Sequence, residues 1–149
     1  MTDRNIFGFS EFCNANPGRN VGGYDYVHAV HKTANLSGDF LIWFGKLMWP
    51  QLVEMNGLIY ISDLYSNERY ENFISGGRSK KQAQFWMNLL EISGIFDDLP
   101  DEQMKLLAKN IAECWSAKIR QDFGENHEGA RVIVDEENGE VFVVVGWPD

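Results

Sequence analysis

The chain has little cysteine and no long apolar run, and each shortage excludes a class of protein. Its two cysteines, Cys13 and Cys114, form neither a CxxC pair nor a disulfide framework, so we expect reduced thiols and a cytoplasmic location. The longest unbroken apolar runs, 40–44 and 141–145, are five residues each, far short of the ~20 that span a bilayer. The sequence therefore predicts a protein that is neither secreted nor inserted in a membrane.

Signatures of catalysis and of cofactor binding are also missing. There is no HExxH or CxxC for a metal, no GxSxG nucleophile elbow, and neither GxxxxGK[ST] nor GxGxxG to hold a phosphate. His28 and His31 form the one clustered pair of potential metal ligands. That interpretation needs a helix here, because residues i and i+3 share a side of a helix but point to opposite faces of a strand. We expect no metal, no cofactor and no catalytic residue, and we favour a non-catalytic protein over an enzyme.

Basic residues are too few to balance the acidic ones. Thirteen Lys and Arg against 22 Asp and Glu give a net charge of −9. Residues 1–36 sum to zero, 37–100 to −3 (eight acids, five bases) and 101–149 to −6 (eleven acids, five bases). An acidic field repels a phosphate backbone, so we expect no nucleic-acid partner. The charge suits a basic protein partner, or it serves only to keep the protein in solution.

The length and composition predict one folded domain. A chain of 149 residues with 44% hydrophobic residues can bury a single core, so we assign 1–149 to one domain. Residues 1–36 combine Gly, Asn and Pro breakers with scattered aromatics, which predicts an irregular segment docked on the body, because aromatics are costly to leave in water. Within it, 24–32 fits either a short strand or a helical turn.

Turn and cap residues indicate the fold class. Asn56-Gly57 and Asn138-Gly139 each lie between apolar runs, which is the strongest short-range signal for a β-hairpin. Capping and breaking residues delimit helices from Ser37 to Pro50, from Ser66 to Phe73, from Ser79 to Gly94 and from Asp98 to Phe123. The sequence predicts an α+β domain in which the two Asn-Gly hairpins form one antiparallel sheet, with about four helices packed against it.

Apolar periodicity indicates which residues form the core. Trp43, Trp86 and Trp115 fall on apolar helical stripes and are predicted to be buried. Trp49 and Trp147 are less constrained, and either is suited to line a pocket or to anchor a partner. In the last hairpin, alternation places five valines on one core-facing side: Val132, Val134, Val141, Val143 and Val145.

The opposite side of the last hairpin is the main candidate site. Asp135, Glu136, Glu137 and Glu140 crowd its turn, while Ile133, Phe142 and Val144 make its base apolar. Unpaired carboxylates are costly to bury, so we expect the acidic end to be exposed. The four acids would attract a basic partner, and Phe142, Val144 and Trp147 would supply apolar anchors.

These observations favour a small acidic protein-binding domain of the inhibitor, immunity, antitoxin-like or adaptor type. One alternative is a small-ligand-binding protein or enzyme whose pocket lies between the N-terminal segment and the sheet, using Asp25, Tyr26, His28 and His31. Another alternative is a homo-oligomeric structural protein in which the hairpin face forms the subunit contact.

Overall fold

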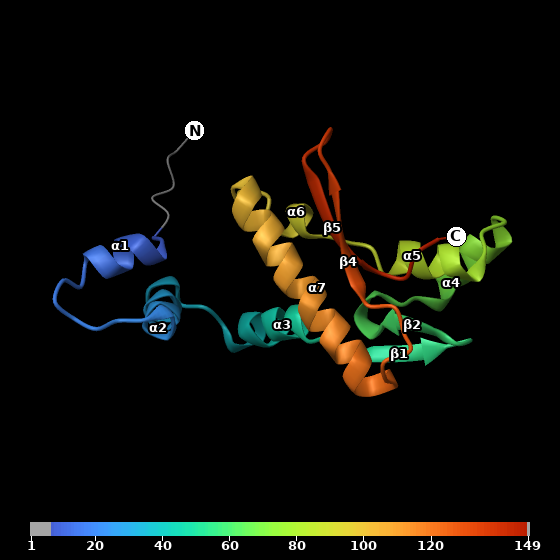
Figure 1. The fold of residues 1–149 in the computed structure, drawn as a ribbon, viewed down its shortest axis with the longest axis horizontal. Helices are drawn as coiled ribbons and strands as arrows, with labels where there is room; N and C mark the ends of the chain where they lie inside the picture. The colour runs from blue at the N-terminus through green and yellow to red at the C-terminus, as the bar shows by residue number, and fades with distance from the viewer. Residues whose placement is uncertain (1–6, 149) are drawn as a thin grey trace. The chain divides into compact units, whose positions relative to one another are not determined.

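The computed structural model describes residues 7–148 and shows an α+β protein. Over these residues it contains seven α-helices, one short 3₁₀ helix and five strands (Figure 1). The chain divides into two compact units, Met1–Ile42 and Trp43–Asp149, and helix α3 (Gly38–Met48) is continuous through the division. In the described part of the chain, every helix is too short or too polar to serve as a membrane span.

The first unit is helical where the sequence predicted irregular structure. It contains α1 (Phe9–Asn14) and α2 (Gly23–Ala34), so the ambiguous stretch 24–32 is helical. Asp25 stabilises the start of α2, because its carboxylate accepts a hydrogen bond from the Gly22 backbone N–H at 2.7 Å. Asn35 ends the helix in the left-handed conformation, with a φ of 52°.

Aromatic side chains hold the first unit together. The Tyr26 ring packs against the rings of Phe7, Phe9 and Phe12, with centroid separations of 5.9, 5.7 and 5.8 Å. The Tyr26 hydroxyl also donates a hydrogen bond to the Phe7 carbonyl at 2.6 Å. These aromatics therefore pack within their own segment, and the docking of that segment on the rest of the chain stays a prediction.

The second unit contains all five strands of residues 7–148. From Leu52 to the C-terminal hairpin its elements are β1 (Leu52–Met55), β2 (Leu58–Ile61), the 3₁₀ helix η1 (Ser62–Leu64), α4 (Asn67–Ser75), α5 (Lys80–Met87), β3 (Leu90–Glu91), α6 (Ile92–Ile95), α7 (Asp101–Phe123), β4 (Ala130–Asp135) and β5 (Glu140–Val145).

Both predicted Asn-Gly hairpins form. Asn56 and Gly57 have φ values of 54° and 79°, the positive values that a tight β1–β2 turn requires. In the β4–β5 hairpin, Gly139 has a φ of 67°, and Val132 lies opposite Val143. This pairing confirms that the five valines share one face, but Val134, close to the turn, is 37% exposed, so its predicted place in the core is wrong.

The prediction that the two hairpins share one sheet is wrong. β1 and β2 form one sheet, and β3, β5 and β4 form another in that order. Fully buried Asn88 lies between them: its Oδ1 accepts from the Ile61 N–H at 3.0 Å, and its Nδ2 donates to the carbonyls of Ile59 at 2.9 Å and Val145 at 3.1 Å. Gln84 also donates to the Ile59 carbonyl, at 3.0 Å. Because side-chain amides satisfy the facing backbone groups, β2 and β5 do not pair.

Asn88 also marks where a predicted helix ends early. The helix expected to continue to Gly94 stops at Met87, and Asn88 follows it as the C-terminal cap. Leu90 and Glu91 then extend as β3 and pair with β5, before the short helix α6 begins. The break places a third strand beside the C-terminal hairpin.

The long helix α7 provides one side of the core. Its buried stripe includes Ile111, Trp115 and Ile119, as the sequence predicted, and it packs against the valines of β5. The Trp115 indole Nε1 donates to the Leu47 carbonyl at 2.8 Å, which ties the end of α3 to the same core.

Two of the three tryptophans predicted to be buried are not. Trp115 is buried, but Trp43 on α3 is 56% exposed and Trp86 on α5 is 44% exposed. On α3, the residues that pack against the core are Leu47 and Met48 near its C-terminal end. On α5, the side chain that is buried is the neighbouring Phe85.

Candidate functional site

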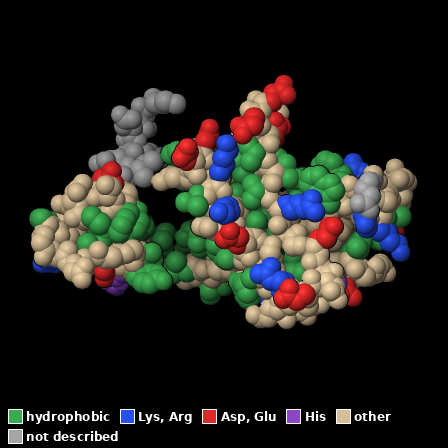
Figure 2. Space-filling view, viewed as in Figure 1, with side chains coloured by type: hydrophobic (Ala, Val, Ile, Leu, Met, Phe, Trp, Pro, Cys, Tyr) green, Lys and Arg blue, Asp and Glu red, His purple; other side chains and the backbone are tan. Residues whose placement is uncertain are grey.

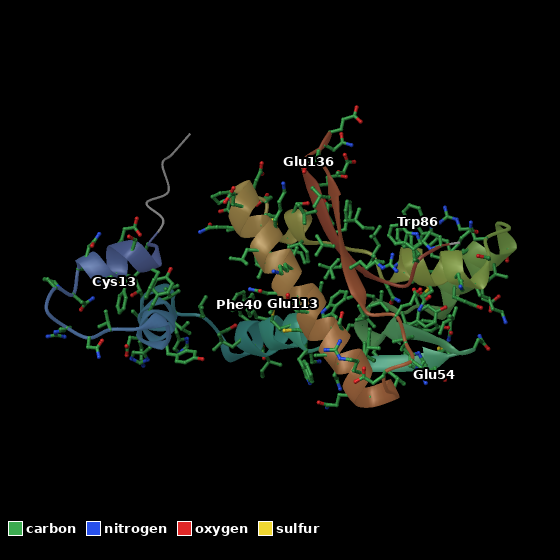
Figure 3. All side chains as sticks on the ribbon, viewed as in Figure 1. Cys13, Phe40, Glu54, Trp86, Glu113 and Glu136 are labelled. Atoms are coloured by element: carbon green, nitrogen blue, oxygen red, sulfur yellow. The ribbon has the colours of Figure 1, made fainter. Side chains whose placement is uncertain are left out.

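The end of the β4–β5 hairpin carries a concentrated negative charge. We call Asp135, Glu136, Glu137 and Glu140 the acidic tip; Figure 3 labels Glu136 there, and acidic side chains gather at this end in Figure 2. The third strand pairs with β5 only at Phe142 and Val143, so the tip extends past β3 as two strands and a turn.

The four carboxylates of the acidic tip have different environments. Asp135 accepts hydrogen bonds from the Glu137 N–H at 3.1 Å and from the Asn138 backbone and side chain at 3.2 and 2.9 Å. The Asn138 side-chain bond is the main reason that the pKa of Asp135 lies below its usual value. Glu136 contacts Lys105 on α7 at 3.2 Å. Glu137 and Glu140 contact no cation among the described residues.

The apolar base of the hairpin is only partly available. Ile133 and Phe142 lie opposite each other and are half-buried. Val144 is fully buried, so its predicted role as an exposed anchor is wrong. The reason is that β5 is the central strand of its sheet and α5 packs against it.

An aromatic surface lies beside this base, and the sequence did not predict it. Phe85 contacts the rings of Trp86 and Trp147 at centroid distances of 5.3 and 5.8 Å. Trp86 and Trp147 are 44% and 42% exposed, and the guanidinium groups of Arg78 and Arg131 lie 5.0 and 5.1 Å from their respective ring centroids. We call these five residues the aromatic surface; Figure 2 shows hydrophobic side chains gathered at the position where Figure 3 labels Trp86.

One sequence signal could have indicated that Trp86 is exposed. Phe85 and Trp86 are adjacent on a helix, where neighbouring side chains point about 100° apart. A narrow buried stripe cannot hold both rings equally well. Burial of Phe85 therefore turns Trp86 outward.

A cavity of about 230 Å³ adjoins the aromatic surface. Trp147 lines it, together with the buried amide of Gln84 and the backbone of Gly146. Gly146 has a φ of 91°, and a Cβ at this position would lie 2.5 Å from Gln84 Oε1. The close approach of these two residues explains why glycine is required at the cavity wall.

The residues proposed for the alternative ligand site all lie on α2, in the first unit. Asp25 caps this helix and Tyr26 packs in the aromatic cluster, so both have structural roles. His28 is exposed, whereas His31 is half-buried and its Nδ1 has no hydrogen-bond partner among the residues that the structure describes. Across residues 7–148, no group of three His, Cys, Asp or Glu side chains is placed to hold a metal ion. Cys13 and Cys114 are free thiols.

No protein-family model, curated protein or solved structure matches this chain. The functional proposal therefore rests on the geometry of the chain itself.

Proposed function

We propose that the chain is a non-catalytic, cytoplasmic protein-binding domain whose C-terminal hairpin contacts a basic partner. The acidic tip attracts that partner, and Phe142 and Trp147 anchor it. The observation that carries the proposal is the position of an incompletely neutralised acidic tip and an exposed aromatic surface on one hairpin and its flank. An inhibitor, an immunity or antitoxin-like protein, or an adaptor would work in this way.

The charge of the acidic tip supports a basic partner. Four carboxylates are matched there by one described cation, Lys105. Asp135 and Glu140 also lie directly opposite each other, an arrangement of like charges that destabilises a hairpin. A complementary partner would relieve this repulsion. Such charges act mainly on the association rate, and salt weakens their effect.

The aromatic surface supplies the features expected of anchors. Tryptophan and arginine are enriched among the residues that dominate binding energy. Trp147 is already held by Phe85 and Arg131, so little side-chain freedom is left to lose on binding. The cavity beside Trp147 has room for one side chain of a partner. Val144 is fully buried and is not available for direct contact with a partner.

The ligand-binding alternative receives less support. Two of its four residues, Asp25 and Tyr26, already have structural roles in α2 and its aromatic cluster. The cavity described above lies in the second unit and contains none of the four.

Affinity capture with matched variants of the full chain tests the proposal. The tip variant is Glu136→Gln/Glu137→Gln/Glu140→Gln, and it leaves Asp135 in place because that residue holds the turn. The control variant changes three exposed acids elsewhere: Glu54→Gln/Glu71→Gln/Glu125→Gln. Both variants have a net charge of −9 + 3 = −6. Proteins from the native lysate retained at low salt are identified and compared.

We expect a basic protein that wild type and control retain and that the tip variant loses. A second comparison uses Trp147→Ala against Trp49→Ala, because the two rings are 42% and 43% exposed. Trp147→Ala should speed dissociation of the partner, and Trp49→Ala should not. Equal retention by the tip variant and the control would show that net charge alone, and not this hairpin, attracts the partner.

A further inference from the structure

Strand β4 has one side that pairs with no other strand of residues 7–148. The strand order β3-β5-β4 places β4 at the edge of its sheet. Natural edge strands are commonly protected by proline, by lysine or by a bulge, because an open edge pairs readily with another chain. β4 runs without a bulge from Ala130 to Asp135, has three apolar residues in a row at its centre, and contains neither proline nor lysine.

The backbone of Ala130 shows which groups of β4 face the open side. The Ser116 hydroxyl on α7 accepts a hydrogen bond from the Ala130 N–H at 2.8 Å and donates one to the Ala130 carbonyl at 3.5 Å. Both groups of Ala130 therefore point away from β5. In an antiparallel pair, successive residues direct their backbone groups alternately towards and away from the neighbouring strand. Val132 and Val134 follow at intervals of two, so their N–H and C=O groups also face the open side.

Strand β5 indicates the same orientation. Val141 lies opposite Val134, and its N–H donates to the Ser93 hydroxyl at 3.0 Å, beyond one end of β3. The Val145 carbonyl accepts from Asn88 at 3.1 Å, beyond the other end of β3. These groups of β5 point away from β4, as the alternation requires. The two N–H and two C=O groups on the open side of β4 have no hydrogen-bond partner among residues 7–148.

Side chains of opposite charge lie beside the same open edge. Arg131 is exposed; its guanidinium lies 5.1 Å from the Trp147 ring centroid and contacts no carboxylate in the described part of the chain. Ile133 and Asp135 follow on the same face at intervals of two residues. On the other face, Val134 is 37% exposed, although it shares that face with the core valines. The edge thus presents a cation, an apolar residue and an anion in order.

We infer that the open edge of β4 pairs with β4 of a second copy of this chain, antiparallel and with Ile133 on the two-fold axis. This register sets Arg131 directly opposite Asp135 of the second copy, twice, and Ile133 opposite its own equivalent. Val132 lies opposite Val134 of the second copy, also twice. Each of these valine pairs exchanges two hydrogen bonds, so every outward backbone group finds a partner. The edge is complementary to itself in hydrogen bonding and in charge, as a two-fold interface requires.

Other pairings match this edge less well. Moving the two-fold axis to Val134 would set the apolar Ile133 opposite Asp135. An extended segment of a basic partner would meet the unpaired charge of Arg131. The described part of the first unit is helical, so it offers no strand to this edge.

The position of α7 is compatible with the dimer. α7 packs against both β4 and β5, and a two-fold axis perpendicular to the sheet keeps the two copies of α7 on the same face. They then lie about two strand spacings apart, ~10 Å, which is close to the usual distance between packed helices. A six-residue strand and one helix present less area than the ~1,600 Å² of a standard interface. We therefore expect a dissociation constant on the order of micromolar.

Sedimentation of the full chain over a range of concentrations measures dimerisation, and amide hydrogen exchange shows where it occurs. The amides of Val132 and Val134 should exchange roughly tenfold more slowly above the dissociation constant than below it, because pairing gives each of them a carbonyl acceptor. The Ile133 amide faces β5 in either state and is the internal control, so its exchange should change little.

A charge-reversed variant tests the register. Arg131→Glu sets Glu against Asp135 of the second copy at both contacts. It should dimerise roughly tenfold more weakly than Lys80→Glu, which makes the same change of charge at an exposed position on α5. Circular dichroism and melting temperature establish that both variants are folded. Should Arg131→Glu not fold, the exchange comparison on wild type still decides.

Three results would overturn the inference. One is a wild type that stays monomeric up to millimolar concentration, whether its edge is then open or another segment protects Val132 and Val134. Another is a dimer in which the exchange of these two amides does not slow. The third is dimerisation that Arg131→Glu weakens no more than Lys80→Glu does.

Discussion

Replacing Asn88 by leucine should destabilise the protein strongly, although leucine has a similar shape and is more apolar. The change removes the only described partners of two buried backbone groups, the Ile61 N–H and the Val145 carbonyl. The Ile59 carbonyl also loses a bond but keeps the one from Gln84. A buried polar group without a partner costs about 1–3 kcal/mol, so two such groups predict a loss of about 2–6 kcal/mol. Total stabilities are about 5–15 kcal/mol, so this is a large fraction.

Urea unfolding measured by tryptophan fluorescence gives this cost, and Gln84→Leu is the matched control. Gln84 is also a buried amide, but its one side-chain hydrogen bond within residues 7–148 goes to the Ile59 carbonyl, which Asn88 would still satisfy. Gln84→Leu should therefore cost about 1 kcal/mol. If Asn88→Leu cost no more than Gln84→Leu, the two sheets would not depend on the Asn88 bonds as described here.

Two further predictions concern buried aromatic residues. Trp115→Ala should destabilise the protein by about 3–5 kcal/mol in the same urea assay, because it opens a cavity in the core and removes the hydrogen bond to the Leu47 carbonyl. A cost below about 1 kcal/mol would contradict this prediction. Burial, and then the nearby Tyr70 and Tyr65, raise the pKa of Tyr60 from 10.0 to about 12. The stability that neutral Tyr60 contributes should be complete below pH 10 and fall as the pH rises towards 12, because Tyr60 ionises at a lower pH in the unfolded chain than in the folded one. Absorbance titration of the folded protein should show one tyrosine that ionises at higher pH than the others, and Tyr60→Phe should remove that step.

The features that local sequence determines were predictable. Asn56-Gly57 fixes a tight turn through two residues with positive φ, whatever surrounds it. The apolar stripe of α7 repeats over six turns, so its buried side was clear, and Trp115 and Ile111 lie on it as predicted. Both cases depend on residues close together in the chain.

The arrangement of the hairpins was not predictable in the same way. It depends on Asn88, a single amide that bonds to backbone groups 27, 29 and 57 residues away. Nothing in the local pattern distinguishes this asparagine from one on a helix surface. The helix predicted from Ser79 to Gly94 concealed both the break at Asn88 and the strand β3.

The candidate site was predictable in part. Alternation along β5 correctly grouped the side chains by face, but it does not tell which face another element covers, and so Val144 was misassigned. Trp86 was assigned to the core because its spacing fits a helical stripe, and the aromatic surface was missed with it. On α3, apolar residues lie all round the helix, and Trp43 was assigned to the core although it is 56% exposed.

The association rate of the captured basic partner, measured by stopped flow, tests the role of the acidic tip most directly. At low salt, Glu136→Gln/Glu137→Gln/Glu140→Gln should associate about tenfold more slowly than Glu54→Gln/Glu71→Gln/Glu125→Gln, which has the same net charge. The difference should shrink as salt is raised, while the dissociation rates stay similar. Equal association rates for the two variants at low salt would contradict the proposal and leave the acidity of the hairpin as a contribution to solubility alone.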